Sequence, residues 1–284
     1  MTAWAAQQAM TVWLIFKNLF NMKQTVLLIL AFVCALLGVQ RAEAKIYLVA
    51  VGVSDYPGTA NDLTLPANDA KTTAWLYSKN TKVKYSLLLN GQATQKRIKA
   101  AMKKVYGEAK ANDIVVFFFS GHGYPGGFVA YDGMLDYSVV RDGMANNKCK
   151  NKMIFADACF AGKIRTNNNG HSSVSAAKKA NVMLFLSSRG NETSLEKPGM
   201  KNGFFTTYLV KGLRGGADKN RDRTITAKEL FNYVHSGVIQ LSGNRQHPVM
   251  WGKFANNMPV MKWYFFFEKL NMNGLARLLL LCER

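Results

Sequence analysis

The sequence contains few cysteines, and their number and spacing exclude two kinds of stabilising site. Of the four cysteines in 284 residues, only Cys149, Cys159 and Cys282 lie beyond the N-terminal region. A set this sparse and odd in number does not make a disulfide framework and indicates a free, reactive thiol. Neither the cysteines nor the histidines show the short pair spacing of a zinc site. The sequence therefore predicts no zinc site.

Acidic residues are also scarce. Seventeen Asp and Glu residues stand against 37 Lys and Arg residues, which gives a formal net charge of +20 at pH 7. Such a surplus favours anionic partners. Because no nucleic-acid-binding motif accompanies it, we interpret the charge as a solvated basic surface and predict no binding of nucleic acid.

The N-terminal region has the pattern of a secretory signal peptide. A single lysine precedes an apolar stretch, residues 26–39, and the tripeptide Ala-Glu-Ala at residues 42–44 matches a cleavage site. The apolar stretch is short for a membrane-spanning helix. We therefore expect residues 1–44 to be a signal peptide with an over-extended start before Met22. The mature protein would be exported to the periplasm, the cell surface or the extracellular space.

The rest of the chain shows no internal repeat and alternates apolar strand patterns with helical ones. This order predicts an α/β fold, a mostly parallel sheet with helices on both faces. Strands are predicted at residues 45–53, 85–89, 114–119, 153–156 and 182–187. Helices are predicted at residues 66–78, 94–109, 204–212 and 227–241. We assign residues 45–263 to one domain and leave residues 264–284 unassigned.

Two of the apolar strands end in chemically active residues. The stretch VVFFFSGHG, residues 115–123, places His122 between two glycines, and KMIFADAC, residues 152–159, ends in Cys159. Ligands and catalytic groups collect beyond the carboxyl ends of parallel strands. If the two strands are neighbours, we expect the imidazole and the thiol to meet there. The glycines would let the backbone turn and let a substrate approach closely.

A thiol beside an imidazole predicts nucleophilic catalysis. His122 would take the proton of Cys159 to make a thiolate, and would later protonate the leaving amine. Backbone N–H groups of Gly123 and Cys159 would hold the oxyanion. This arrangement performs acyl transfer, most simply the hydrolysis of a peptide bond.

Each of these two residues has a polar neighbour two positions earlier, Ser120 in one strand and Asp157 in the other. Residues two apart in an extended chain point to the same side. We therefore expect both neighbours to face the same cleft, where a carboxylate attracts a cationic substrate side chain.

These segments resemble the caspase-like cysteine peptidases, most closely the metacaspase branch. The similar stretches are FFFSGHG, IFADACFAG, VGVSDYPG with LPANDA, and SSRGNETSLE with NGFFTTYLVKGLRG. The resemblance implies a three-layer α/β sandwich, a catalytic dyad of His122 and Cys159, and a specificity pocket lined by Asp69, Ser120 and Asp157. It implies a peptide or protein substrate cleaved after Arg or Lys. The sequence gives no indication of the oligomeric state.

Two alternatives stay open. One is a clostripain- or gingipain-type peptidase of the same clan, and the other is a non-catalytic caspase-like binding protein. The polar loop after Cys159 contains four basic residues, and the resemblance makes self-cleavage there a hypothesis; they are Lys163, Arg165, Lys178 and Lys179.

One further stretch resembles a calcium-binding loop, although we predict no required cofactor. Its residues fall at the ligand positions of such a loop: Asp218, Asn220, Asp222, Thr224 and Glu229. Arg223 replaces the glycine of the turn and adds a positive charge. The structural alternative is a polar turn in which Thr226 caps the next helix. Calcium binding by this loop is kept as a hypothesis.

Overall fold

The computed structural model describes residues 44–80, 82–145, 147–158, 181–189, 192, 194–197 and 199–263. Residues 1–43 of the predicted signal peptide, Cys159 with the polar loop after it, and the unassigned tail at residues 264–284 lie outside the described residues. Within the described part of the chain, no helix is long and apolar enough to cross a membrane.

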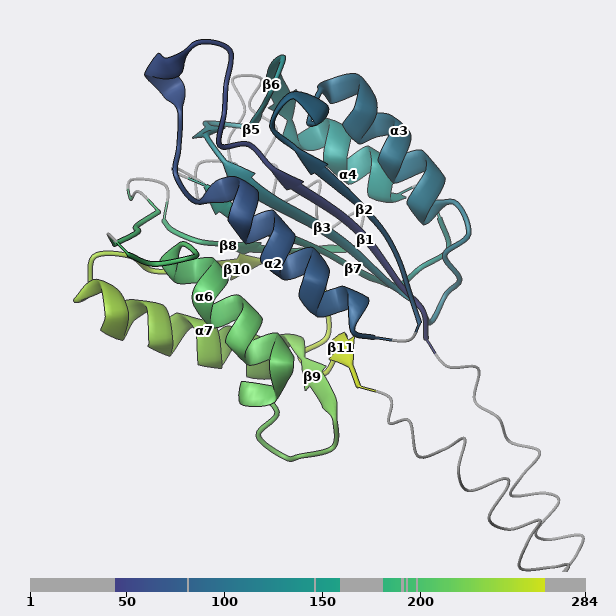
Figure 1. Ribbon diagram of the computed structural model, residues 1–284. Coiled ribbons are helices and arrows are strands. Elements are labelled where there is room, and N and C mark those ends of the chain that lie inside the picture. Colours follow the sequence, from purple (N-terminus) through teal and green to yellow (C-terminus); the bar gives the residue numbers. More distant parts are fainter. Residues whose placement is uncertain are drawn as a thin grey trace, which may run out of the picture. The chain divides into compact units, whose positions relative to one another are not determined.

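A six-stranded sheet forms the centre of the domain (Figure 1). The five predicted strands are confirmed and pair in parallel, while a sixth strand, β10, joins the edge in antiparallel orientation. The strand order is β10-β8-β7-β3-β1-β2. The bounds are β1 Ile46–Gly52, β2 Val83–Leu89, β3 Ile114–Gly121, β7 Asn151–Ala158, β8 Val182–Leu186 and β10 Val249–Trp251.

Helices cover both faces of the sheet, as predicted, so the domain is a three-layer α/β sandwich (Figure 1). One face packs against α3 and α4, and the other against α2, α6 and α7. The bounds are α2 Pro66–Ser78, α3 Gln95–Tyr106, α4 Tyr137–Ala145, α6 Phe204–Lys211 and α7 Ala227–Ser242. The Thr94 side chain caps α3, and α3 ends three residues before the predicted residue 109, where Gly107 follows.

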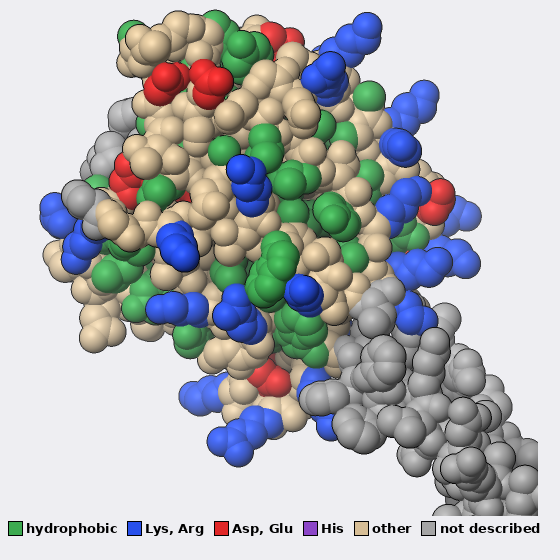
Figure 2. Space-filling view, in the orientation of Figure 1, with side chains coloured by type: hydrophobic (Ala, Val, Ile, Leu, Met, Phe, Trp, Pro, Cys, Tyr) green, Lys and Arg blue, Asp and Glu red, His purple; other side chains and the backbone are tan. Residues whose placement is uncertain are grey.

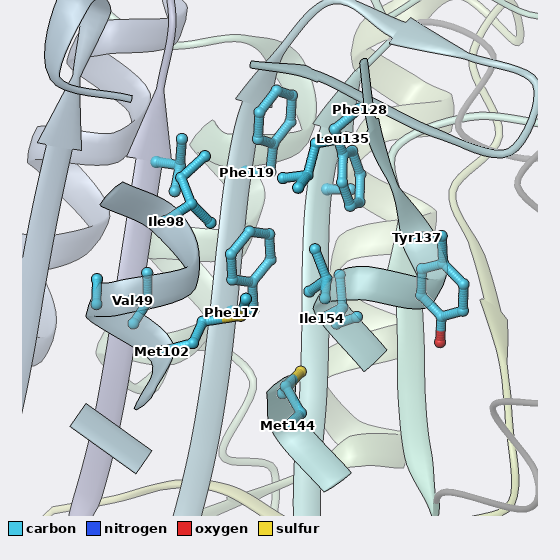
Figure 3. Packing of buried hydrophobic residues seen from close by; sticks show 14 of the residues in the cluster. Val49, Ile98, Met102, Phe117, Phe119, Phe128, Leu135, Tyr137, Met144 and Ile154 are labelled. Atoms are coloured by element: carbon cyan, nitrogen blue, oxygen red, sulfur yellow. The ribbon is translucent and has the colours of Figure 1, made fainter. Parts of the chain in front are cut away.

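The core explains why residues 114–119 of β3 form a continuous run of large apolar residues. All eight residues of β3 are buried, because side chains on both faces of the strand meet a helix layer. Phe117 and Phe119 pack on the α3 side, where the Phe119 ring stacks on Phe128 at 4.6 Å (Figure 3). Phe118 packs on the opposite face. Burying a phenylalanine side chain stabilises a fold by about 1.5–3 kcal/mol, so β3 is held firmly from both sides.

Two small sheets and α4 were not predicted from the sequence. A three-stranded antiparallel sheet follows β3 directly. A two-stranded sheet is formed by β9, just before α7, and β11, near residue 260. Their strands have two to four residues, too few for a readable alternation. The bounds are β4 Gly123–Tyr124, β5 Gly127–Ala130, β6 Gly133–Asp136, β9 Thr224–Thr226 and β11 Pro259–Lys262.

Candidate active site

The strands that carry the candidate residues are direct neighbours. β3 and β7 pair in parallel, with Ser120 opposite Asp157 and Gly121 opposite Ala158. Gly121 and Ala158 are the last pair of the two strands. In the sequence, His122 follows Gly121 and Cys159 follows Ala158. Cys159 itself lies outside the described residues, and the described part of the site consists of His122 and the groups around the two strand ends.

The imidazole of His122 is half-buried and has one ring nitrogen engaged. Its Nε2 lies 2.8 Å from the backbone carbonyl oxygen of Asn61. A carbonyl oxygen only accepts hydrogen bonds, so this contact assigns the proton to Nε2 and leaves Nδ1 as the basic nitrogen of the neutral ring. Among the described residues, no hydrogen-bond partner faces Nδ1. The ring is thus held in the tautomer that a general base requires.

Tyr56 holds the backbone of His122 from the other side. Its hydroxyl accepts a hydrogen bond from the His122 backbone N–H at 2.9 Å and donates one to the Val129 carbonyl at 3.2 Å. The two rings also contact each other, with centroids 5.0 Å apart. Burial raises the pKa of Tyr56 to about 12, so the phenol stays neutral and keeps both roles.

This close approach explains the glycine that precedes the histidine. Gly121 has a φ of +154°, and a Cβ placed there would lie 2.7 Å from the Tyr56 hydroxyl. A side chain at residue 121 would push away the group that fixes His122. Gly123, predicted to supply an oxyanion donor, is the half-buried first residue of β4 and pairs with Phe128.

The three residues predicted to line a specificity pocket lie together, and we refer to Asp69, Ser120 and Asp157 as the acidic cluster. Ser120 Oγ donates to Asp69 Oδ2 at 2.8 Å, and Ser120 faces Asp157 across the β3–β7 pair. All three are buried, with exposed fractions of 2%, 2% and 5%. Asp69 comes from the first turn of α2, so this helix brings a second carboxylate to the ends of the two strands.

The carboxylate of Asp157 also stabilises the start of α6. Its Oδ2 accepts from the backbone N–H and the hydroxyl of Thr206 at 3.1 and 2.7 Å, and its Oδ1 accepts from Ser194 at 2.6 Å. A negative group at a helix N-terminus satisfies free N–H groups and interacts favourably with the helix dipole. Asp157 therefore has a structural role in addition to any contact with a substrate.

The acidic cluster brings together two buried carboxyl groups whose simultaneous ionisation is unfavourable. Burial raises the pKa of both carboxyl groups, and repulsion from Asp157 raises the pKa of Asp69 further, well above its usual range. Hydrogen bonds from Asn202 and from the Gly203 backbone act in the opposite direction. Within the part of the chain that the structure describes, neither carboxylate forms an ion pair with a lysine, arginine or histidine. A cationic group entering from outside would relieve this repulsion.

Several residues of the site escaped the sequence analysis. The contacts join residues far apart in the chain: Asn61 with His122, and Ser194 or Thr206 with Asp157. Spacing along the chain carries no signal for such pairs. A partial signal lies in two of the motifs quoted above: Tyr56 of VGVSDYPG contacts His122, and Ser194 of SSRGNETSLE contacts Asp157.

In the loop that resembles a calcium site, several side-chain oxygens at the ligand positions already accept hydrogen bonds from within the loop. Glu229 forms a capping box with Thr226, which confirms the predicted helix cap, and its Oε1 also accepts from the Lys219 backbone. Both oxygens of Asp218 accept backbone N–H groups of the same loop. Among the described residues, no group of three or more His, Cys, Asp and Glu side chains is arranged to hold a metal ion. Calcium binding stays a hypothesis.

A mostly parallel sheet between two helix layers, with a fixed imidazole and a buried acidic cluster at the carboxyl ends of its central strands, is the arrangement of a caspase-like α/β protein. The sequence matches the caspase domain over residues 46–258. The chain belongs to this family of cysteine peptidases.

Solved structures share the fold at low sequence identity. Caspase-1 from Spodoptera frugiperda has a TM-score of 0.56 and 13% identity, and the match covers 78% of this chain and 91% of that one. The Geobacter sulfurreducens protein GSU0716 has a TM-score of 0.54 and 15% identity, with 78% of this chain and 100% of that one covered. No curated protein matches the sequence.

Proposed function

We propose that the protein is a cysteine endopeptidase in which Cys159 is the nucleophile and His122 its general base. The observation that carries this proposal is the register of β3 and β7, in which the two residues come directly after the paired Gly121 and Ala158. Membership of the caspase domain family supports it. Resemblance at the quoted motifs favours the metacaspase branch.

The described contacts of His122 indicate how the reaction would proceed. With its Nε2 proton held by the Asn61 carbonyl, Nδ1 takes the proton of the Cys159 thiol. The thiolate attacks the substrate carbonyl, and backbone N–H groups of Gly123 and Cys159 stabilise the oxyanion. The imidazolium then protonates the leaving amine, and water hydrolyses the acyl-enzyme with His122 again acting as base.

For the substrate, we propose cleavage after Arg or Lys. The carboxyl groups of Asp69 and Asp157 are buried, and no cation pairs with them in the described structure. They therefore favour a substrate whose side chain carries a positive charge. Charged hydrogen bonds of this kind are short and strong when buried.

The direct test compares reporter peptides that carry Arg, Lys or Asp before the scissile bond, with and without calcium, using the wild type and Cys159→Ala. Cleavage of the Asp peptide alone would contradict the proposed specificity. If neither the wild type nor Cys159→Ala cleaved any of the peptides, the binding-protein alternative would be favoured.

We also propose that the protein is exported. The support is the sequence pattern alone: an apolar stretch at residues 26–39 followed by Ala-Glu-Ala at residues 42–44. N-terminal sequencing of the protein recovered from its native host checks this, since the mature chain would begin at Lys45.

Removing the hydroxyl of Tyr56 tests how the histidine is positioned. We expect Tyr56→Phe to lower kcat about tenfold, because the His122 backbone loses its hydrogen bond and the ring shifts from its working geometry. KM should change little, since the Tyr56 hydroxyl bonds to the His122 and Val129 backbones and not to the acidic cluster. Steady-state kinetics measure both, and urea unfolding of the same variant is the control. A wild-type kcat in a correctly folded Tyr56→Phe protein would contradict this role.

Binding of a basic substrate should depend on pH. Below the raised pKa of Asp69, the empty protein carries a proton on the acidic cluster, and an arginine side chain must displace it. KM for an Arg peptide should therefore fall as pH rises through the raised pKa of Asp69. Asp69→Asn is the control, because its profile should lack this fall. Parallel KM profiles in the two proteins would show that the cluster does not titrate with substrate.

A further inference from the structure

A surface on the helix layer away from the histidine combines an exposed tryptophan with a set of cations. Trp75 is 50% exposed and lies on α2, four residues after Lys71 and four before Lys79. Residues four apart share one side of a helix, so the three form a single exposed stripe. Figure 2 shows this face: Lys and Arg side chains surround hydrophobic ones over α2 and α6, and acidic side chains lie toward the edges.

The neighbouring helix adds two more cations to the stripe. Arg214, just beyond α6, lies 5.7 Å from the centroid of the Trp75 ring, and Lys79 lies 4.8 Å from it. Lys211 is exposed on α6 itself. We call this set the α2–α6 face; its members are Lys71, Trp75, Lys79, Lys211 and Arg214.

The charge of the α2–α6 face is not neutralised locally. The only acidic residue in α2, α6 and the turn at residues 212–216 is Asp69, which is buried in the acidic cluster. Within the described residues, none of the four cations of the face forms an ion pair with an acid. Lys79 and Arg214 lie beside the exposed ring, Lys71 lies on the same helix stripe, and Lys211 lies near the Tyr208 ring of the neighbouring helix. This set matches a partner that presents a dense array of negative charge beside apolar material.

We propose that the α2–α6 face docks the protein on the surface of an anionic phospholipid bilayer. Clustered Lys and Arg side chains are attracted to anionic headgroups, and tryptophan prefers the headgroup region, where its ring meets both water and acyl chains. The methylene stems of Lys71 and Lys79 lie along the same stripe and extend its apolar contact.

The surroundings of the Trp75 ring distinguish this partner from nucleic acid. Proteins that bind single strands offer open aromatic faces on which bases stack. Here two cations already lie over the ring, so it is not an open stacking platform. Insertion among lipid headgroups uses the exposed half of the Trp75 residue, and the two cations beside it can contact phosphates.

Docking would leave the candidate active site free. Asp69 is in the first turn of α2, and Trp75 lies six residues further along the helix, about 9 Å along its axis. Neither His122 nor the acidic cluster uses a residue of the α2–α6 face. Cleavage of a small soluble peptide should therefore be unaffected by substitutions on the face.

The test is vesicle co-flotation of the full chain, with phosphatidylcholine vesicles that contain or lack phosphatidylglycerol. We expect the wild type to bind anionic vesicles more strongly than phosphatidylcholine vesicles, with a loss of this excess binding of about tenfold or more for Lys71→Glu with Lys79→Glu, and a smaller loss for Trp75→Ala. All variants keep the same apolar N-terminal region, so its contribution cancels in the comparison. The matched control is Lys96→Glu with Lys104→Glu, two exposed α3 lysines also eight residues apart, on the opposite helix layer.

Three results would contradict docking of the α2–α6 face on a bilayer. An equal loss in the α2 and α3 double variants would show attraction by net charge alone and would overturn it. Equal binding of the wild type to vesicles with and without phosphatidylglycerol, or no binding to either, would also overturn it. A single-stranded DNA arm is run alongside; loss of DNA binding in the α2 variants with unchanged vesicle binding would assign the face to nucleic acid instead. Thermal unfolding and soluble-peptide cleavage confirm that the variants remain folded.

Discussion

Replacing Cys159 with alanine is expected to remove all cleavage of an Arg reporter peptide above background, and His122→Ala is expected to lower kcat by roughly 100- to 10,000-fold. The first substitution removes the proposed nucleophile, and the second leaves the thiol protonated near neutral pH. Initial rates at saturating peptide measure both effects.

The chain offers a matched control for the cysteine. Cys149 is 4% exposed, donates its S–H to the Asp113 carbonyl at 2.9 Å, and has a pKa raised by burial to about 11. A buried thiol of this kind is inert, so Cys149→Ala should retain wild-type kinetics. If the Cys149 variant lost activity and the Cys159 variant kept it, the assignment of the nucleophile would be wrong.

The second large effect is expected for Asp69→Asn. Loss of one buried charge partner should lower kcat/KM for the Arg peptide by about 30-fold or more. The same variant should be more stable than the wild type at pH 7, because the raised pKa of Asp69 means that its ionised form is disfavoured in the folded protein. In the folded protein the pKa of Asp69 is raised, so its ionised form opposes folding once the pH exceeds the unfolded value. The gain should shrink toward about pH 4.

A purely structural role of Asp69 predicts the opposite stability change, because Asn202, Gly203 and Ser120 all hydrogen-bond to its carboxylate. Asp113→Asn is the control: this acid is also buried, accepts from the Lys45 and Lys110 backbones, and lies where β3 begins. Its substitution should destabilise the fold and leave the preference for Arg unchanged. Higher activity together with lower stability in Asp69→Asn would contradict the proposed substrate role.

The central sheet could be predicted because burial on both faces leaves a direct trace in the sequence. The run in β3 is apolar without interruption, and the same holds for β1 and β8. Strand β10 has three half-buried residues, and the strands of the small antiparallel sheet after β3 have two to four. Such short segments contain too few residues to show a period. Their positions follow from packing against the finished sheet.

The candidate site was predicted as far as its residues terminate strands. His122, Ser120 and Asp157 could be named because an apolar run precedes each of them. Asp69 came only from the family resemblance, and the groups that orient these residues were missed. Tyr56 reaches His122 across 66 residues and Thr206 reaches Asp157 across 49, so only the fold brings them together.

The central claim is that the Cys159 thiol and the His122 imidazole act as a pair above the ends of β3 and β7. The most direct measurement is peptide mapping by mass spectrometry after reaction with an arginyl chloromethyl ketone, which alkylates an activated thiol held near an arginine-binding pocket. We predict a single modified cysteine, Cys159, in the wild type, and almost none in His122→Ala at the same reagent concentration. Equal modification of Cys149 and Cys159, or labelling of Cys159 that does not depend on His122, would contradict the account.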